Sequence, residues 1–203
     1  MKKAAIAGFA AGAAMAIGGA LGAVSSISNS RPAIDPNAEV MNPMIGGQAM
    51  LADHDLMANI SASPEHARLA TALRESGIAA ALKSKGQFTL FAPVDAAFTV
   101  EDSGGNKAQM AHRMGYLVVP GKLDSQALLQ QIAQGGGEAR LHTIEGGILT
   151  ARLNGATNIA LMDERGRTAD ISIYDVRASN GVIMVIDHMA APSGPPRQVA
   201  LNN

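Results

Sequence analysis

Residues 88–98, with the sequence FTLFAPVDAAF, constrain the fold more than any other part of this chain. The run around Phe91 is almost entirely apolar and β-prone, which is typical of a strand that is buried on both faces. Pro93 has no N–H group and is expected to end this strand. Asp95 follows where its carboxylate can accept the free amides of a helical turn over residues 96–98. The segment therefore predicts a buried strand, a stop and a capped turn in close succession.

A second run that is apolar throughout, residues 182–186, lies near the C-terminus. Asn180 and Gly181 precede it and favour a tight turn, because both residue types tolerate positive φ. Asp187 then returns the chain to solvent. We therefore expect a second buried strand, with the centre of each run lying in the core.

Helical and β-prone segments surround these two runs. Ser63 before Pro64 is a favourable helix start, since proline fits the first helical position. Helices are expected over residues 63–76, 78–84 and 107–114 and after a cap at 124 or 125. Residues 116–119 predict a short strand, and from residue 140 short β-prone runs alternate with glycine-containing turns.

The composition predicts one domain and excludes several classes of function. A chain of 203 residues that is 47% hydrophobic can bury one substantial core. Its net charge of −1 offers no concentrated basic face, so nucleic acid is not an expected partner. The chain has no cysteine, which excludes disulfides, thiolate metal sites and a cysteine nucleophile.

Residues 1–24 predict export. Lys2 and Lys3 precede an uncharged span rich in Ala and Gly, the order found in secretory signal peptides. The span is also long enough to cross about 30 Å of hydrocarbon, so an uncleaved N-terminal anchor is the alternative. In either case we expect a periplasmic or extracellular domain whose only membrane contact is this segment.

The flanks of the domain differ from it in composition. Residues 25–50 contain Pro32, Pro36 and Pro43 without a periodic apolar face, and predict a disordered linker. Residues 51–192 form the predicted domain. Residues 193–203 predict a disordered tail.

Two segments resemble the signatures of the fasciclin (FAS1) domain. FTLFAPVDAAF resembles TLFAPTDAAF, and residues 175–187, DVRASNGVIMVID, look like DI-x-ASNGVIHVID. Weaker likenesses lie at residues 116–122 (YLVVPGK) and 141–147. The resemblance covers about residues 56–192 and implies an α+β fold, a compact wedge of short β-sheets packed with several helices. It also implies structural roles for Phe91, Pro93, Asp95, Phe98, Asn180, Gly181 and Asp187.

The chain departs from the family pattern at three places. Leu117 and Met184 replace histidines of the family, and the tyrosine–histidine pair that ends in Leu117 is linked to adhesion in animal members. Integrin binding is therefore not transferred to this chain. The segment between Phe98 and Tyr116 is shorter than usual, so we expect a groove to be open there.

The sequence contains no constellation typical of an enzyme. GxSxG, HExxH and GxGxxG are absent, and the five histidines never fall at metal-ligand spacing. Asp95 fits a structural cap better than a general base. We predict no catalytic, cofactor or metal site, and a hydrolase ranks only third among the hypotheses.

Two hypotheses for function remain. The resemblance implies an exported, non-catalytic adhesion or recognition module that binds a protein or polysaccharide of the envelope or extracellular matrix. The alternative is a carrier of an apolar small molecule, such as a carotenoid or lipid, in a cleft of the domain. Methionines adapt to irregular ligands, although they fill ordinary cores equally well. The candidate binding residues are Tyr116, Leu117, Met110, Met114 and Met184.

Overall fold

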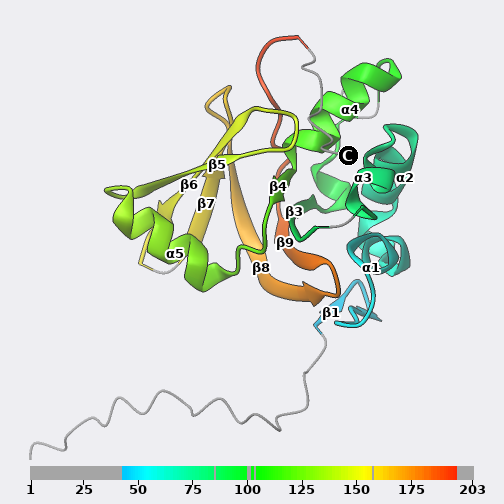
Figure 1. The fold of residues 1–203 in the computed structure, drawn as a ribbon, viewed down its shortest axis with the longest axis horizontal. Helices are drawn as coiled ribbons and strands as arrows, with labels where there is room; N and C mark the ends of the chain where they lie inside the picture. Colours follow the sequence, from blue (N-terminus) through cyan, green and yellow to red (C-terminus); the bar gives the residue numbers. More distant parts are fainter. Residues whose placement is uncertain (1–42, 85, 100–101, 103, 157, 196–203) are drawn as a thin grey trace, which may run out of the picture. The chain divides into compact units, whose positions relative to one another are not determined.

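A computed structural model describes residues 43–195 except 85, 100, 101, 103 and 157 (Figure 1). The predicted leader, the linker as far as residue 42 and residues 196–203 of the predicted tail lie outside this range. Within it, no helix combines the length and the apolar character needed to cross a bilayer.

Helices and strands alternate along the described chain. The N-terminal half contains β1 (Met44–Ile45), β2 (Gln48–Ala49), α1 (Leu56–Ala62), the 3-10 turn η1 (Pro64–His66), α2 (Ala67–Glu75), α3 (Ile78–Leu82), β3 (Phe88–Pro93) and the 3-10 turn η2 (Asp95–Ala97). The C-terminal half contains α4 (Lys107–Tyr116), β4 (Val118–Pro120), α5 (Ser125–Gln134), β5 (Glu138–His142), β6 (Ile148–Asn154), β7 (Asn158–Met162), β8 (Thr168–Ala178) and β9 (Gly181–Ile186).

The two apolar runs lie side by side in one seven-stranded sheet, whose order is β4-β3-β9-β8-β7-β6-β5. β3 and β9 are parallel, with Leu90 opposite Ile183, and all other neighbours in this sheet are antiparallel. Leu90, Phe91 and Ile183 have no exposed surface. The prediction of two buried strands is confirmed, and β3 ends at Pro93 as expected.

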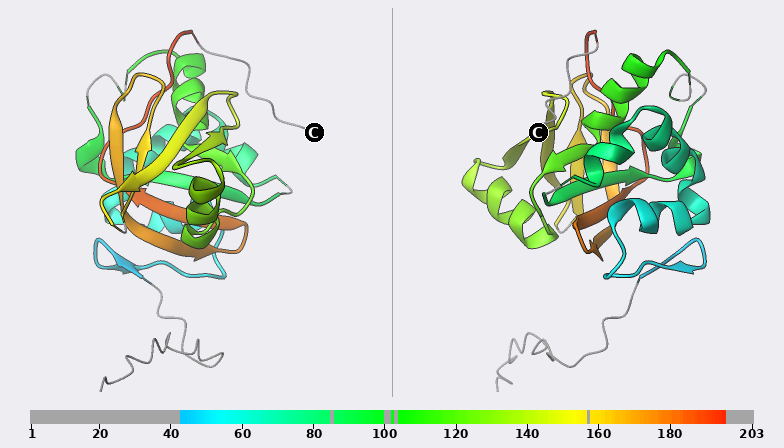
Figure 2. Two further views of the ribbon diagram at one scale, coloured as in Figure 1. Left: turned by 90° about the vertical axis from the view of Figure 1, so that its left-hand side faces the viewer. Right: turned by 45° about the vertical axis from the view of Figure 1, so that its right-hand side comes forward.

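The helices pack on different parts of this sheet. Figure 1 shows α1, α2 and α3 grouped beside β3 and β9, whereas α5 lies near the other end of the sheet and contacts β5 and β6. The views in Figure 2 keep the same grouping. One hydrophobic core joins the helices and the sheet. The predicted α+β fold is confirmed.

Two boundaries differ from the sequence predictions. The hairpin of β1 and β2 places Ile45 and Met50 in the core, each only 1% exposed, so the prediction of a disordered linker is wrong for residues 43–50. At the other end, Ser193 donates hydrogen bonds from its N and Oγ to Glu164 Oε2, at 3.0 and 2.7 Å. Because apolar burial and paired polar groups hold both segments, each belongs to the ordered domain.

The segment before β4 is helical for longer than expected. Asn106 and Gln109 form a reciprocal capping box, with hydrogen bonds of 2.9 and 3.0 Å, that starts α4. The helix then continues through Tyr116, which was predicted to begin a strand. As a consequence, the Tyr116 side chain projects from a helix into the core instead of from a strand.

Candidate binding surface

The second signature joins parts of the fold that are distant in sequence. Asn180 Oδ1 accepts the N–H of Leu56 at 2.8 Å, and its Nδ2 donates to the carbonyl of Leu82 at 2.7 Å. Asn180 therefore links the start of α1 to the end of α3, and it does not adopt the positive φ that its turn predicted. A methyl group at Gly181 would overlap the Phe88 carbonyl, so glycine permits β9 to approach β3.

The acidic signature residues also act across elements. Asp95 does not cap its own turn: its Oδ1 accepts the N–H of Arg68, the second residue of α2, at 2.9 Å. The prediction of a local cap is wrong, because η2 is a single 3-10 turn that lies against the start of α2. Asp187 accepts the N–H of Asp170 from the neighbouring strand at 2.8 Å.

Most of the candidate binding residues lie inside the core. Tyr116, Met114, Leu117 and Met184 have no exposed surface. A side chain with zero accessible area borders no space that a water molecule could enter. The structure therefore does not form the cleft that these residues were expected to line, because α4 turns them inward and β9 lies within the sheet.

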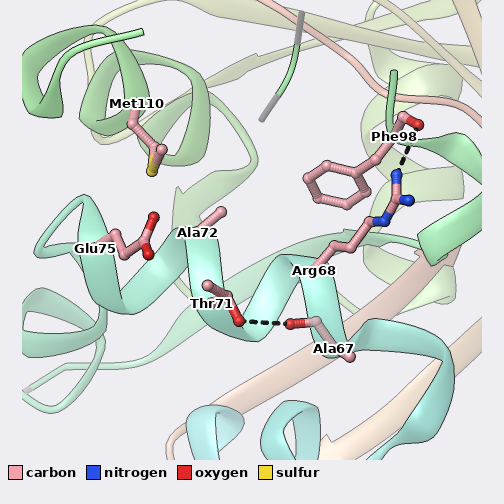
Figure 3. Close-up of a pocket in the computed structure, with 7 residues that line it drawn as sticks. All are labelled: Ala67, Arg68, Thr71, Ala72, Glu75, Phe98 and Met110. Atoms are coloured by element: carbon pink, nitrogen blue, oxygen red, sulfur yellow. Dashed lines mark hydrogen bonds between the residues drawn. The ribbon is translucent and has the colours of Figure 1, made fainter. Parts of the chain in front are cut away.

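Met110 differs from the other methionines because it lines a surface pocket. The pocket lies between α2 and α4 and has a volume of about 290 Å³. Figure 3 shows Phe98 and Arg68 at one end and Met110 and Glu75 at the other. The predicted groove after Phe98 is thus placed beside α2. Its described lining consists of Ala67, Arg68, Thr71, Ala72, Glu75, Phe98 and Met110.

The α2–α4 pocket has an apolar floor and charged ends. Phe98, Ala72 and Met110 are 6–8% exposed and form the floor. Arg68 and Glu75 are exposed and lie two helical turns apart, which is about 10 Å along α2. Arg68 Nη1 donates to the Phe98 carbonyl at 3.3 Å, so the cation is held at the aromatic end. Such a pocket can hold an apolar group with a charge on either side.

A separate group of polar side chains is mostly buried, and we call it the Tyr116 cluster. Its members are His112, Tyr116, Glu145, Asp163 and Glu164. His112 Nδ1 and Glu145 Oε2 are 2.7 Å apart, and both side chains are almost fully buried. The Tyr116 hydroxyl donates to the Ile148 carbonyl at 2.6 Å and accepts the N–H of Glu164 at 3.1 Å.

The cluster brings a histidine, acids and a hydroxyl together, but the hydroxyl is held by two hydrogen bonds to the main chain. Burial raises the pKa of the Tyr116 phenol, the hydrogen bond from the Glu164 N–H opposes this rise, and the charges of the neighbouring acids add to it. The phenol therefore stays protonated and keeps its bond to the main chain, which leaves it unsuited to act as a nucleophile. In the described ranges, no set of three or more His, Cys, Asp or Glu side chains could hold a metal ion.

Sequence reasoning missed the Tyr116 cluster, although two glycines mark it. Side chains at Gly115 and Gly147 would crowd Glu145, and one at Gly147 would also overlap the Tyr116 ring. Glycines at such close contacts show where a buried carboxylate is packed. A single sequence does not distinguish them from ordinary turn glycines, so the pairing of His112 with Glu145 could not be found.

Residues 64–192 match the fasciclin domain family, and this match spans more than half of the chain. The chain belongs to the fasciclin family. Domains of this family are generally adhesion or binding modules without catalytic activity, and they typically occur in extracellular or secreted proteins.

Relatives of similar sequence occur in Synechocystis sp. "Protein sll1483" is 32% identical over 133 residues, which cover 61% of this chain and 66% of the relative. "Uncharacterized protein sll1735" is 30% identical over 127 residues, which cover 60% of this chain and 85% of the relative. The chain thus spans slightly less than two thirds of the first relative.

A solved structure supports the fold. The FAS1 domain pair from the insect cell adhesion molecule Fasciclin I superposes with a TM-score of 0.55 at 17% identity. The match covers 67% of this chain and 50% of that one. At this identity the likeness establishes the shared fold.

Proposed function

We propose that this protein is an exported, non-catalytic recognition module that binds a partner of the envelope or extracellular matrix through the α2–α4 pocket. The observation behind this proposal is the pocket, in which an apolar floor reaches the surface between charged ends. The family's general role in adhesion and its occurrence in secreted proteins support it.

The dimensions and charges of the pocket favour a protein side chain as its occupant. A volume of about 290 Å³ lies at the lower limit for small-molecule sites, which typically measure about 300–1,000 Å³. One or two apolar side chains fill such a space. Arg68 and Glu75 then select a partner segment that has an acidic residue on one side of the apolar anchor and a basic residue on the other.

Filling the pocket tests the proposal. Thr71 is exposed on α2 and lines the pocket, so Thr71→Trp places bulk in it without disturbing the core. Ala133→Trp, at an exposed position on α5, is the matched control. We expect wild type and A133W to capture the same identified partner from an envelope extract, and T71W to capture at least tenfold less. Equal capture by all three proteins would remove the pocket from the proposal.

Export is tested separately. Cell fractionation followed by N-terminal sequencing of the native protein should find the chain outside the cytoplasmic membrane and show whether the leader is cleaved. A chain confined to the cytoplasm would contradict the proposed function whatever the result with T71W.

A further inference from the structure

A second and larger pocket lies between the start of α4 and the C-terminal segment. Its volume is about 630 Å³. Figure 1 shows the C-terminal segment, in red, passing beside α4. We call it the arginine pocket, and the lining residues that matter here are Gln109, His112, Arg113, Arg165, Pro192 and Pro195.

Backbone carbonyls hold both arginines in place. Arg113 Nη2 donates to the Gly104 carbonyl, and its buried Nε has no hydrogen-bond partner. Arg165 Nε donates to the Pro192 carbonyl at 2.9 Å. Since each of these bonds uses one of five N–H donors of a guanidinium, both arginines keep donors for a ligand.

Neither arginine is neutralised by a carboxylate in the part of the chain that the structure describes. The acidic residues that precede Arg165 in the sequence, Asp163 and Glu164, have other roles. Asp163 accepts the N–H groups of residues 165, 167 and 191 and the Nε of Arg167. Glu164 accepts the N–H groups of residues 148 and 193 and the Ser193 hydroxyl. No acidic residue is found among the described residues that line the pocket.

We propose that the arginine pocket binds an oxyanion group, carboxylate or sulfate, of an acidic polysaccharide. A guanidinium group suits such anions because it can donate two parallel hydrogen bonds to one of them, and two arginines line this pocket. The volume exceeds what one acidic side chain needs and accommodates a sugar ring. Pro195, which is exposed, supplies apolar surface for the C–H faces of the ring, and Gln109 supplies an amide for its hydroxyls.

The inference rests on the proposed function in one respect, since an exported module meets such polymers outside the cell. The two sites are separate, so the protein can join a protein partner at the α2–α4 pocket to a polysaccharide at the arginine pocket. An adhesive role requires two attachments of this kind.

Binding of the purified full chain to defined polymers tests the inference by isothermal titration calorimetry. We expect polygalacturonate or dextran sulfate to bind and neutral dextran not to bind. Tighter binding of polygalacturonate assigns the site to carboxylates, and tighter binding of dextran sulfate assigns it to sulfates. Failure of both acidic polymers to bind, or equal binding of dextran, overturns the inference.

Charge-removing variants locate the site. Arg113→Gln/Arg165→Gln should weaken binding at least tenfold, because two charge-assisted hydrogen-bonding groups are lost. Arg165→Gln alone, at an exposed position, should weaken it severalfold without a risk to folding. Arg177→Gln removes an equally exposed charge from β8 and should bind within twofold of wild type.

Three outcomes with the variants overturn the assignment to this pocket. These are an equal loss with R177Q, no loss with R165Q, or polyglutamate binding as tightly as the acidic polysaccharides. Because the assay uses purified protein, its result does not depend on export. A cytoplasmic location would contradict the proposed function without changing these titrations.

Discussion

The β3–β9 pair and the Tyr116 cluster are both buried, yet different forces hold them. β9 is buried along its whole length, and β3 is buried from Thr89 to Pro93. The Tyr116 cluster places four ionisable residues at 0–5% exposure beside the partly buried Glu164, and hydrogen bonds to the main chain hold Tyr116, Asp163 and Glu164. One region is stabilised by contact area, and the other by the direction of individual bonds.

The difference predicts how each region tolerates change. The dry strands should accept substitutions that conserve volume and fail when a cavity is made. The cluster should fail when polarity changes at constant volume, because an unpaired buried polar group is costly. Three measurements test this contrast, and a fourth concerns a buried histidine that lies outside both regions.

Phe91→Ala should have the largest effect. Phe91 is fully buried in β3, and the loss of its ring leaves a cavity that costs about 3–5 kcal/mol. The free energy of unfolding from urea titrations measures this cost. Leu153→Ala, at a side chain that is 45% exposed, is the control and should cost far less. A loss below about 1 kcal/mol for F91A would show that the strands are not rigidly packed.

Asp163→Asn should come next, at about 2–3 kcal/mol, because hydrogen bonds to a charged group are lost at constant volume. The Asp163 side chain has no exposed surface and lies 2.9 Å from Arg167 Nε. Asp53→Asn, at an exposed position, provides the matched control. The same urea titration applies, and if D163N proved as stable as D53N, bond direction would not be what holds the cluster.

Tyr116→Phe should cost about 1–2 kcal/mol, since one hydroxyl serves two main-chain groups. Thermal unfolding monitored by circular dichroism measures the loss. Hydrogen exchange at the Glu164 amide should speed up in the variant, because that N–H loses its acceptor. Unchanged exchange would mean that the hydroxyl bond contributes little.

His66 should give the smallest effect, and it depends on pH. Burial lowers the pKa of His66 below its ordinary value of 6.5, although Asp95, the Ala92 carbonyl and Glu65 act in the opposite direction. The unfolded chain therefore binds the proton more readily, so this contribution to stability is complete above pH 6.5 and is lost as the pH falls through the folded pKa.

Variants isolate this effect. His66→Gln should reduce the loss of unfolding free energy between pH 7 and pH 5, and by less than the cost expected for Tyr116→Phe. His188→Gln, at a side chain that is 72% exposed, is the matched control, and His66→Gln should change the slope more than this control does. Identical slopes for wild type and H66Q would remove His66 as a contributor.

Local sequence signals predicted the elements but not how they meet. Alternation of apolar runs with turn residues was enough to place β3 and β9, and Asp124 caps α5 as expected, with its Oδ1 accepting the N–H of Ala127 at 2.8 Å. The roles of Asp95 and Asn180 were missed because their partners lie 27 to 124 residues away. Those contacts depend on the tertiary fold.

The candidate sites show the same limit. Met110 was predicted to line a cleft and lies in the α2–α4 pocket, and Phe98, which was predicted only to have a structural role, lines the same pocket. The burial of Met114, Leu117 and Met184 was not predicted. Residue type alone does not show which side of a helix or strand faces the core. Arg113 and Arg165 are separated by four strands and gave no common signal.

The position of β9 has a consequence for how the protein is made. β9 is the last strand in the described part of the chain, yet it lies between β3 and β8 in the sheet. Until the ribosome has synthesised it, β3 has no partner on one edge and the nascent polypeptide cannot close its interior. Folding of the domain must therefore wait until β9 has been synthesised, and a chain truncated before Gly181 should be degraded or aggregate.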